Sequence, residues 1–187
     1  MRKLLALLLT VVMMLSVCGV ASAETAGENV VTIAMETSPN LDTQWNAGST
    51  GAWLMSVMYE GLYSVTATGF ELSGAESVEV NEDATVWTFH LKQNAVWNDG
   101  KAVTANDYVY AFKRLVNPEI ATTYMLDYGQ YLKNGAAISG GEKSVDELGV
   151  TAIDDYTLEI QLENPCTFFD SILTYSAFYP LREDCVV

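Results

Sequence analysis

The side chains that most often perform catalysis are sparse in this sequence. His90 is the only histidine, so a Ser-His-Asp catalytic triad or a Cys-His dyad would have to use it. It lies within a run of alternating apolar and polar residues that predicts a strand, and no Gly-x-Ser-x-Gly segment offers a nucleophile elbow. The pattern favours a structural or surface role for His90, and we expect no catalytic residues.

Paired carboxylates are the next candidates, because two of them can run glycoside hydrolysis. They occur at Glu82-Asp83, Asp154-Asp155 and Glu183-Asp184, in predicted turns or near the end of the sequence, where acidic residues serve solubility. The Asp-containing turns lack the spacing of an EF-hand loop. Neither GxxxxGK[ST] nor GxGxxG is present. We therefore expect no metal and no cofactor.

The overall composition excludes one class of partner. The 187 residues carry 9 Lys and Arg against 24 Asp and Glu, a formal net charge of -15. Binding to nucleic acid requires a basic surface, so we expect no nucleic-acid partner. Half of the residues are hydrophobic and 18% are charged, which argues against wholesale disorder. The aromatic residues could form walls for peptides or sugars, but alternation favours core positions for Trp87, Phe89 and Phe112.

Residues 1–23 have the pattern of an export signal. Arg2 and Lys3 precede an almost wholly apolar run from Leu4 to Val20, and Ala21-Ser22-Ala23 forms a cleavage site. An uncleaved membrane anchor is the alternative. Both place the protein outside the cytoplasmic membrane of a bacterium, in the periplasm or at the cell surface.

The cysteines raise two further alternatives. Cys18 stands in a lipobox-like run and could carry a lipid anchor, but the branched Val17 before it favours simple secretion. Cys166 and Cys185 could form a disulfide after export, and two unpaired thiols are the favoured alternative.

Periodicity predicts alternating strands and helices, and so an α/β fold. In the first third we expect a strand at Val30–Met35, a small-residue loop at Asn46–Gly51, a helix at Ala52–Tyr59 and a short strand at Gly61–Val65. Further on, we expect two hairpins, a helix capped by Thr104 and Asp107, an irregular helical stretch and a last helix from Pro165. The hairpins pair Glu76–Val80 with Val86–Leu91 and Val150–Ile153 with Tyr156–Leu162, the irregular stretch spans Tyr124–Tyr131, and the last helix would bury Phe168, Phe169, Ile172 and Leu173.

Several long motifs resemble the oligopeptide/dipeptide-binding family of bacterial solute-binding proteins, family 5. They are Trp87–Lys92 (WTFHLK), Ala95–Tyr110 (AVWNDGKAVTANDYVY), Tyr59–Leu62 (YEGL) and the hairpin Leu148–Glu159. Within them we expect Trp97 and Asp99-Gly100 to hold the fold, as a packed ring and a tight turn.

The resemblance implies a receptor subunit of an ABC importer that closes two lobes over a peptide and then docks on the permease. Family members are more than twice this length. The chain is therefore expected to be a mixed α+β fragment of a two-lobed periplasmic-binding-protein-like fold. Residues 24–59 would begin lobe I, and residues 60–184 would form the family's small extra domain. The rest of lobe I and all of lobe II would be absent.

The resemblance also carries over two pieces of a ligand site. Ala47, Gly48 and Ser49 match the segment whose backbone pairs with an extended peptide, and an ordinary loop before a helix is the alternative. Tyr124 matches a tyrosine that lines the peptide cleft, and simple packing is the alternative.

Three functions stay open at this point. The first is a peptide receptor with peptide and permease subunits as partners, peripheral to the membrane unless Cys18 is lipidated. The second is the same scaffold serving a disaccharide, a nickel chelate or haem. The third is an unrelated secreted enzyme or carbohydrate-binding module built on the aromatic hairpins.

Overall fold

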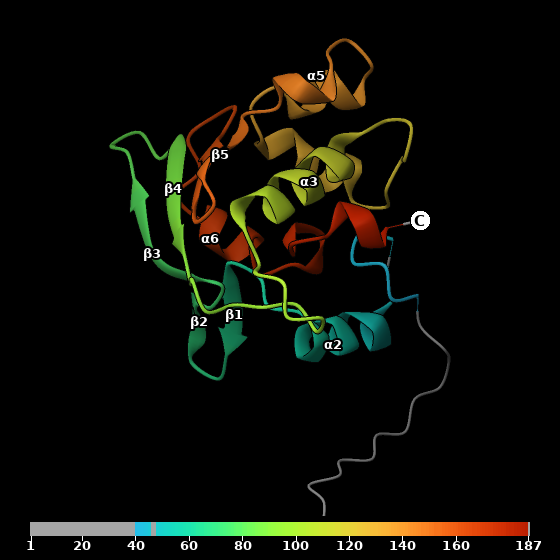
Figure 1. Cartoon of the computed structure of the whole chain (residues 1–187). Coiled ribbons are helices and arrows are strands. Elements are labelled where there is room, and N and C mark those ends of the chain that lie inside the picture. Colours follow the sequence, from blue (N-terminus) through green and yellow to red (C-terminus); the bar gives the residue numbers. More distant parts are fainter. Residues whose placement is uncertain (1–39, 46–47, 187) are drawn as a thin grey trace, which may run out of the picture. The chain divides into compact units, whose positions relative to one another are not determined.

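The computed structural model describes residues 40–45 and 48–186, all within one compact unit that spans residues 37–187 (Figure 1). The predicted export signal, Cys18, the strand at Val30–Met35 and Ala47 lie outside the described residues.

The first described elements are a helix and a small hairpin. Helix α2 (Ser49–Met58) begins three residues before the predicted start, so Ser49 to Gly51 belong to the helix and not to a loop. The amide of Ala52 donates to the carbonyl of Gly48 (2.9 Å), which closes the first turn around small side chains. The predicted short strand is β1 (Tyr63–Thr66), and it pairs with β2 (Gly69–Leu72), a strand that the periodicity did not predict.

A four-stranded antiparallel sheet packs one face on the core of the unit. Its order is β3-β4-β6-β5, built from β3 (Ala75–Val80), β4 (Val86–Leu91), β5 (Val150–Asp154) and β6 (Thr157–Gln161). Both predicted hairpins are confirmed, as β3-β4 and β5-β6. In the central pair, Trp87 lies opposite Ile160 and Phe89 opposite Leu158. All four are buried, as the alternation predicts.

Helix α3 (Ala105–Val116) packs against β5 and β6 (Figure 1). The predicted cap is confirmed, because the Thr104 amide donates to Oδ2 of Asp107 (2.7 Å). The helix ends at Val116, and its C-cap residue Asn117 precedes a proline. Its apolar stripe of Tyr108, Phe112 and Leu115 is buried in the same core as the inner face of the sheet.

Short helices complete the unit. They are α4 (Met125–Tyr128), α5 (Gly135–Ser139) and α6 (Phe169–Ile172), with 3-10 turns at Gly129–Tyr131, Val145–Glu147, Ser176–Phe178 and Glu183–Cys185. The prediction for the last helix was wrong in its start, since α6 begins at Phe169 and not at Pro165. The Cys166 amide instead donates to the carbonyl of Ala84 (3.1 Å), which keeps this stretch out of the helix. Phe168 is 55% exposed, contrary to the prediction, because it precedes the buried turn.

Two further expectations concern the cysteines and the membrane. Cys166 and Cys185 are both free thiols, the first buried and the second exposed, which confirms the favoured alternative. Among the helices of residues 40–45 and 48–186, none has the length and apolar character that a membrane span needs.

Candidate functional site

The first predicted piece of the site stands at the start of α2. Gly48 is the residue before the helix and has an extended backbone (φ -100°, ψ 145°). Ser49 is the first helical residue, and both residues are exposed. Their backbone is therefore at the surface, where another chain could reach it, while Ala47 is not described.

The second piece, Tyr124, stands at the start of α4 within a group of aromatic rings. Its ring centroid lies 5.5 Å from that of Tyr128, which in turn lies 5.1 Å from Tyr175 and 5.5 Å from Phe178. Tyr124 is half-buried, and Tyr175 is 53% exposed. Burial, followed by the neighbouring Tyr175, raises the pKa of Tyr128 above its ordinary range. Tyr124 thus packs on one side and keeps part of its ring accessible, so packing and ligand contact are compatible.

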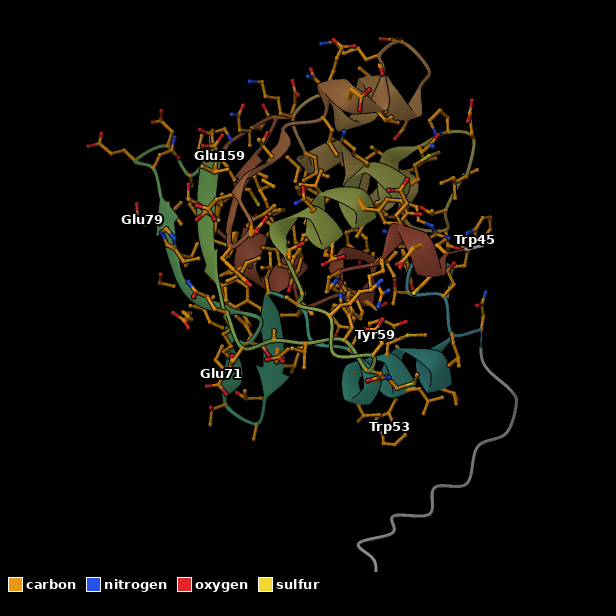
Figure 2. All side chains as sticks on the ribbon, viewed as in Figure 1. Trp45, Trp53, Tyr59, Glu71, Glu79 and Glu159 are labelled. Atoms are coloured by element: carbon orange, nitrogen blue, oxygen red, sulfur yellow. The ribbon has the colours of Figure 1, made fainter. Side chains whose placement is uncertain are left out.

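Residues 42–45, which we call the anchor turn, contact Thr123, the residue before Tyr124. The Thr123 amide donates to the carbonyl of Gln44 (3.2 Å), and Oγ1 of Thr123 donates to the carbonyl of Trp45 (3.5 Å). Trp45 is 41% exposed and is labelled in Figure 2. The anchor turn and the segment before α4 are therefore in direct contact.

Sequence reasoning missed the polar residues that hold the anchor turn. Gln44 is fully buried, and Arg114 of α3 is 6% exposed. Arg114 pairs with Asp42, with Nη2 of the arginine 2.6 Å from Oδ2 of the aspartate. A signal existed in the sequence, since Arg114 stands one turn after Ala111 and next to Leu115, on the apolar side of the helix. A charge at such a position requires a buried partner.

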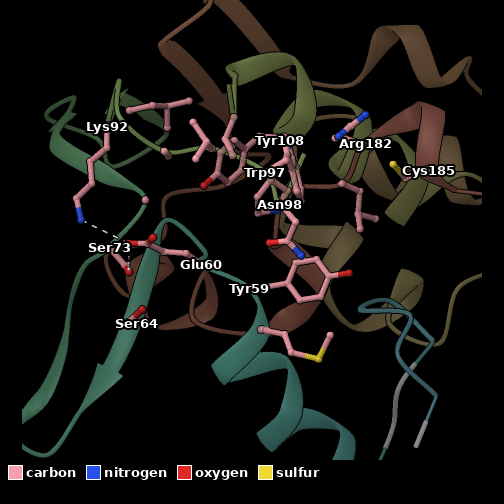
Figure 3. Close-up of a pocket in the computed structure, with 18 of the residues that line it drawn as sticks. Tyr59, Glu60, Ser64, Ser73, Lys92, Trp97, Asn98, Tyr108, Arg182 and Cys185 are labelled. Atoms are coloured by element: carbon pink, nitrogen blue, oxygen red, sulfur yellow. Dashed lines mark hydrogen bonds and ion pairs between the residues drawn. The ribbon is translucent and has the colours of Figure 1, made fainter. Parts of the chain in front are cut away.

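The YEGL motif (Tyr59–Leu62) stabilises the fold and is separate from the residues predicted to bind the ligand. The ring of Tyr59 stacks on that of Tyr179, at 6.3 Å between centroids. Oε1 of Glu60 accepts a hydrogen bond from Oγ of Ser73 (2.8 Å) and pairs with Nζ of Lys92 (3.4 Å), as Figure 3 shows. Leu62 is buried in the core.

A cavity of about 840 Å³ lies beside this motif (Figure 3). It is bounded by the end of α2, the loop that contains Trp97 and the segment around Arg182. Of the predicted ligand residues that the structure describes, none lines it. Burial raises the pKa of Tyr108 on its wall, so that hydroxyl stays protonated across the physiological range.

The turn that contains Trp97 also has the predicted structural role. Gly100 has a positive φ of +86°, and its amide donates to the carbonyl of Trp97 (2.8 Å). The guanidinium of Arg182 lies 6.0 Å from the Trp97 ring centroid and donates to Oδ2 of Asp99 (2.6 Å). That hydrogen bond holds the pKa of Asp99 below its usual range. The ring and the turn are thus tied to the segment around Arg182.

The other candidates for chemistry are dispersed. His90 lies on β4 with Nε2 3.6 Å from Oε1 of Glu79, and both side chains are substantially exposed. Glu79 and Glu159 lie at the outer side of the sheet (Figure 2). Within the described part of the chain, no three His, Cys, Asp or Glu side chains are grouped as a metal site would require.

Comparison with known proteins finds one matching family model and several relatives similar in sequence and in structure. Residues 70–184 match the model of the bacterial extracellular solute-binding proteins, family 5 Middle. The periplasmic oligopeptide-binding protein OppA of Salmonella typhimurium is 38% identical over 131 residues, 69% of this chain and 24% of that protein. The structure of Listeria monocytogenes OppA bound to peptide superposes with a TM-score of 0.75 at 38% identity, over 78% of this chain and 29% of that one. The structure of Haemophilus influenzae OppA in complex with RPPGFSPFR gives a TM-score of 0.72 at 35% identity, over 77% and 28%.

The chain spans about a quarter of the length of the Salmonella relative. The superposition with both OppA structures confirms a mixed α/β fold that corresponds to part of an OppA-type binding protein.

Proposed function

This chain belongs to the family 5 bacterial extracellular solute-binding proteins, and we propose that it binds oligopeptides as the receptor component of an ABC importer. The family consists of binding proteins and not of enzymes. The observation that supports the proposal is the contact of Thr123 with Gln44 and Trp45, which lie shortly before Gly48 in the sequence, in a chain related to peptide binders.

The recognition uses main-chain groups first. The backbone of residues 47–49 pairs with an extended peptide in the manner of an added strand, which is indifferent to the ligand's side chains. Gly48 allows a close approach because it has no Cβ. The accessible part of the Tyr124 ring then packs against one ligand side chain.

Charge favours one class of peptide. The formal net charge of -15 attracts cationic ligands and raises their rate of encounter at low ionic strength. The peptide RPPGFSPFR, which is present in the Haemophilus OppA structure, contains two arginines and no acidic residue. It is therefore the probe that we would use.

Export, partners and domain limits complete the proposal. Residues 1–23 direct secretion and are removed, and the mature protein acts in the periplasm or at the cell surface, where it delivers peptide to permease subunits. Its attachment to the membrane is peripheral, and a lipid on Cys18 is the alternative. Residues 24–59 begin lobe I, and residues 60–184 form the small extra domain.

Site-resolved NMR titration tests peptide binding directly. RPPGFSPFR is added to the ¹⁵N-labelled chain at up to millimolar concentration, because a dissociation constant of about 1 mM still corresponds to about -4 kcal/mol. We expect the amide signals of residues 48–52 and 123–128 to move. Saturable shifts with maltose, a nickel–histidine chelate or haemin, and none with the peptide, would refute the peptide assignment.

A matched pair of variants locates the ligand. Tyr124→Leu should weaken peptide binding about tenfold, the size of one lost aromatic contact. Tyr156→Leu is the control, because Tyr156 is also a partly buried tyrosine that packs on the core but stands at the β5-β6 turn. Equal loss in both variants would contradict a ligand role for Tyr124.

A further inference from the structure

The aromatic group around Tyr128 leaves one ring largely open to solvent. Tyr175 is 53% exposed, although its ring centroid lies only 5.1 Å from that of Tyr128. Tyr128 is itself half-buried and rests on Phe178, a core residue whose ring centroid lies 5.5 Å away. Tyr128 and Tyr175 therefore form an accessible aromatic surface on a packed base, which we call the tyrosine pair.

The positive side chains of this chain are engaged away from the tyrosine pair. Arg2 and Lys3 lie outside the described residues, and each of the other lysines and arginines has an acidic or amide partner elsewhere in the chain. Arg182, which lies over a ring, is 6.0 Å from the centroid of Trp97. A cation on the tyrosine pair would therefore come from another molecule.

The electrostatic surroundings of the tyrosine pair favour such a cation. Burial, then the neighbouring Tyr175, and to a smaller extent the charge of Asp127 raise the pKa of the Tyr128 hydroxyl, so the ring stays a neutral phenol. The face of such a ring attracts an ammonium or guanidinium group within about 6 Å of its centroid. The exposed Asp127, which precedes Tyr128 on α4, adds a negative charge beside the ring.

We propose that Tyr128 and Tyr175 form a subsite for a cationic side chain, an arginine or a lysine of the bound peptide. The inference rests on the proposed function for its ligand, and it adds a specificity for charge that one ring at Tyr124 does not supply. Tyr128 stands between Tyr124 and Tyr175, at 5.5 and 5.1 Å between ring centroids. An extended chain advances about 3.3 Å per residue, so a ligand residue about two or three positions from the one on Tyr124 reaches Tyr175.

The test combines two peptides with three variants. The peptides are RPPGFSPFR and the same sequence with both arginines replaced by citrulline, which keeps the shape of arginine and removes its charge. Tyr175→Leu removes the ring, and Tyr175→Phe keeps the ring and removes the hydroxyl. Tyr156→Leu is the control, because Tyr156 is a partly buried tyrosine at the β5-β6 turn. Since Tyr175 is more than half exposed, its replacement leaves the core in place, which urea unfolding of each variant verifies.

The measured quantity is the ratio of the affinities for the two peptides. We expect the original chain, Tyr175→Phe and Tyr156→Leu to prefer the arginine peptide equally, and Tyr175→Leu to lose about three- to tenfold of that preference. All of these proteins have the same net charge, so the general attraction of an acidic chain for a cationic peptide cancels in the comparison. An unchanged preference in Tyr175→Leu would overturn the proposal. Equal weakening of both peptides would mean that an apolar ligand side chain occupies the tyrosine pair, and would also overturn it.

A small probe separates this inference from the proposed function. N-acetylarginine amide and N-acetylcitrulline amide are added to the ¹⁵N-labelled chain at up to about 100 mM, since a single cation–π contact is weak. We expect the amide signals of Tyr128 and Tyr175 to move with the arginine probe alone, and not in Tyr175→Leu. If the original chain binds no RPPGFSPFR, this response decides. A selective response leaves the subsite standing while the proposed function fails, and the lack of one overturns both.

Discussion

Replacement of Gly61 by alanine is a sharp test of the packing around the YEGL motif. A Cβ at this position would lie 2.6 Å from both Cδ1 and Cε1 of Tyr179 and 3.4 Å from the carbonyl oxygen of Tyr63. The Tyr179 ring cannot simply rotate away. It is 7% exposed, stacks on Tyr59 and has its hydroxyl 3.4 Å from the carbonyl of Thr174.

Two opposing effects set the expected change in the free energy of unfolding. Overpacking of a well-packed site destabilises the folded state by about 1–3 kcal/mol. The substitution also reduces the conformational freedom of the unfolded chain, which offsets about 0.4–1 kcal/mol of that loss. We therefore expect Gly61→Ala to lower the free energy of unfolding by about 1–2 kcal/mol. For a domain of this size that corresponds to a decrease in Tm of roughly 2–8 °C.

The assay is urea unfolding of the chain followed by circular dichroism, with Gly140→Ala as the control. A Cβ at Gly140 would make ordinary contacts of 3.4 and 3.7 Å, and the backbone there is right-handed helical (φ -79°), so little change is expected. In a Tyr179→Ala background, Gly61→Ala should cost nothing further, because the obstructing ring is gone. A loss below about 0.5 kcal/mol in the original background would refute the reasoning, since exposed sites show changes of that size.

Three other predictions concern ionisation and thiols. Burial raises the pKa of Tyr108, so the folded state holds that proton more tightly and loses stability as the pH rises above about 10, the unfolded pKa. Tyr108→Phe should flatten that decline, by up to about 1.4 kcal/mol per pH unit, in urea titrations between pH 9 and 11. Hydrogen bonds from Arg182 lower the pKa of Asp184, so their stabilisation is present above about pH 4 and disappears as the pH falls below it. Asp184→Asn should therefore lower Tm at pH 7 more than at pH 3. Ellman's reagent should modify the exposed Cys185 in the folded chain but Cys166 only in urea, because burial encloses Cys166 and raises its pKa.

Local patterns predicted most of the sheet and the longest helix correctly. The alternation of Trp87, Phe89 and Leu91 indicated the buried face of β4, and the pairing with β6 places those residues in the core. The Thr104-Asp107 spacing indicated the start of α3 to the residue. These features depend on neighbours within a few positions, so they can be read without knowledge of the fold.

The errors arose where a distant contact overrides the local pattern. The apolar run after Pro165 has helical spacing, but the hydrogen bond from Cys166 to Ala84 holds the chain beside the sheet until α6 begins. Similarly, β2 has no strong alternation, and it forms because the turn at residues 67–68 brings the chain back along β1, with Gly69 (φ +145°) opposite Thr66.

The sequence by itself determined the class of secondary structure, the capping of α3, the tight turn at Gly100 and, through the resemblance of its motifs, the family and the residues Gly48, Ser49 and Tyr124 as site candidates. Only the tertiary structure decided that the anchor turn contacts the segment before α4, and that the side chains of Gln44 and Arg114 form a buried pair. The physical reason is the range of the interactions. The hydrogen bond between these two side chains joins residues 70 positions apart, and no local periodicity encodes it. It exists only after α3 has packed on the sheet and the buried face of the helix has left one charged side chain to be paired.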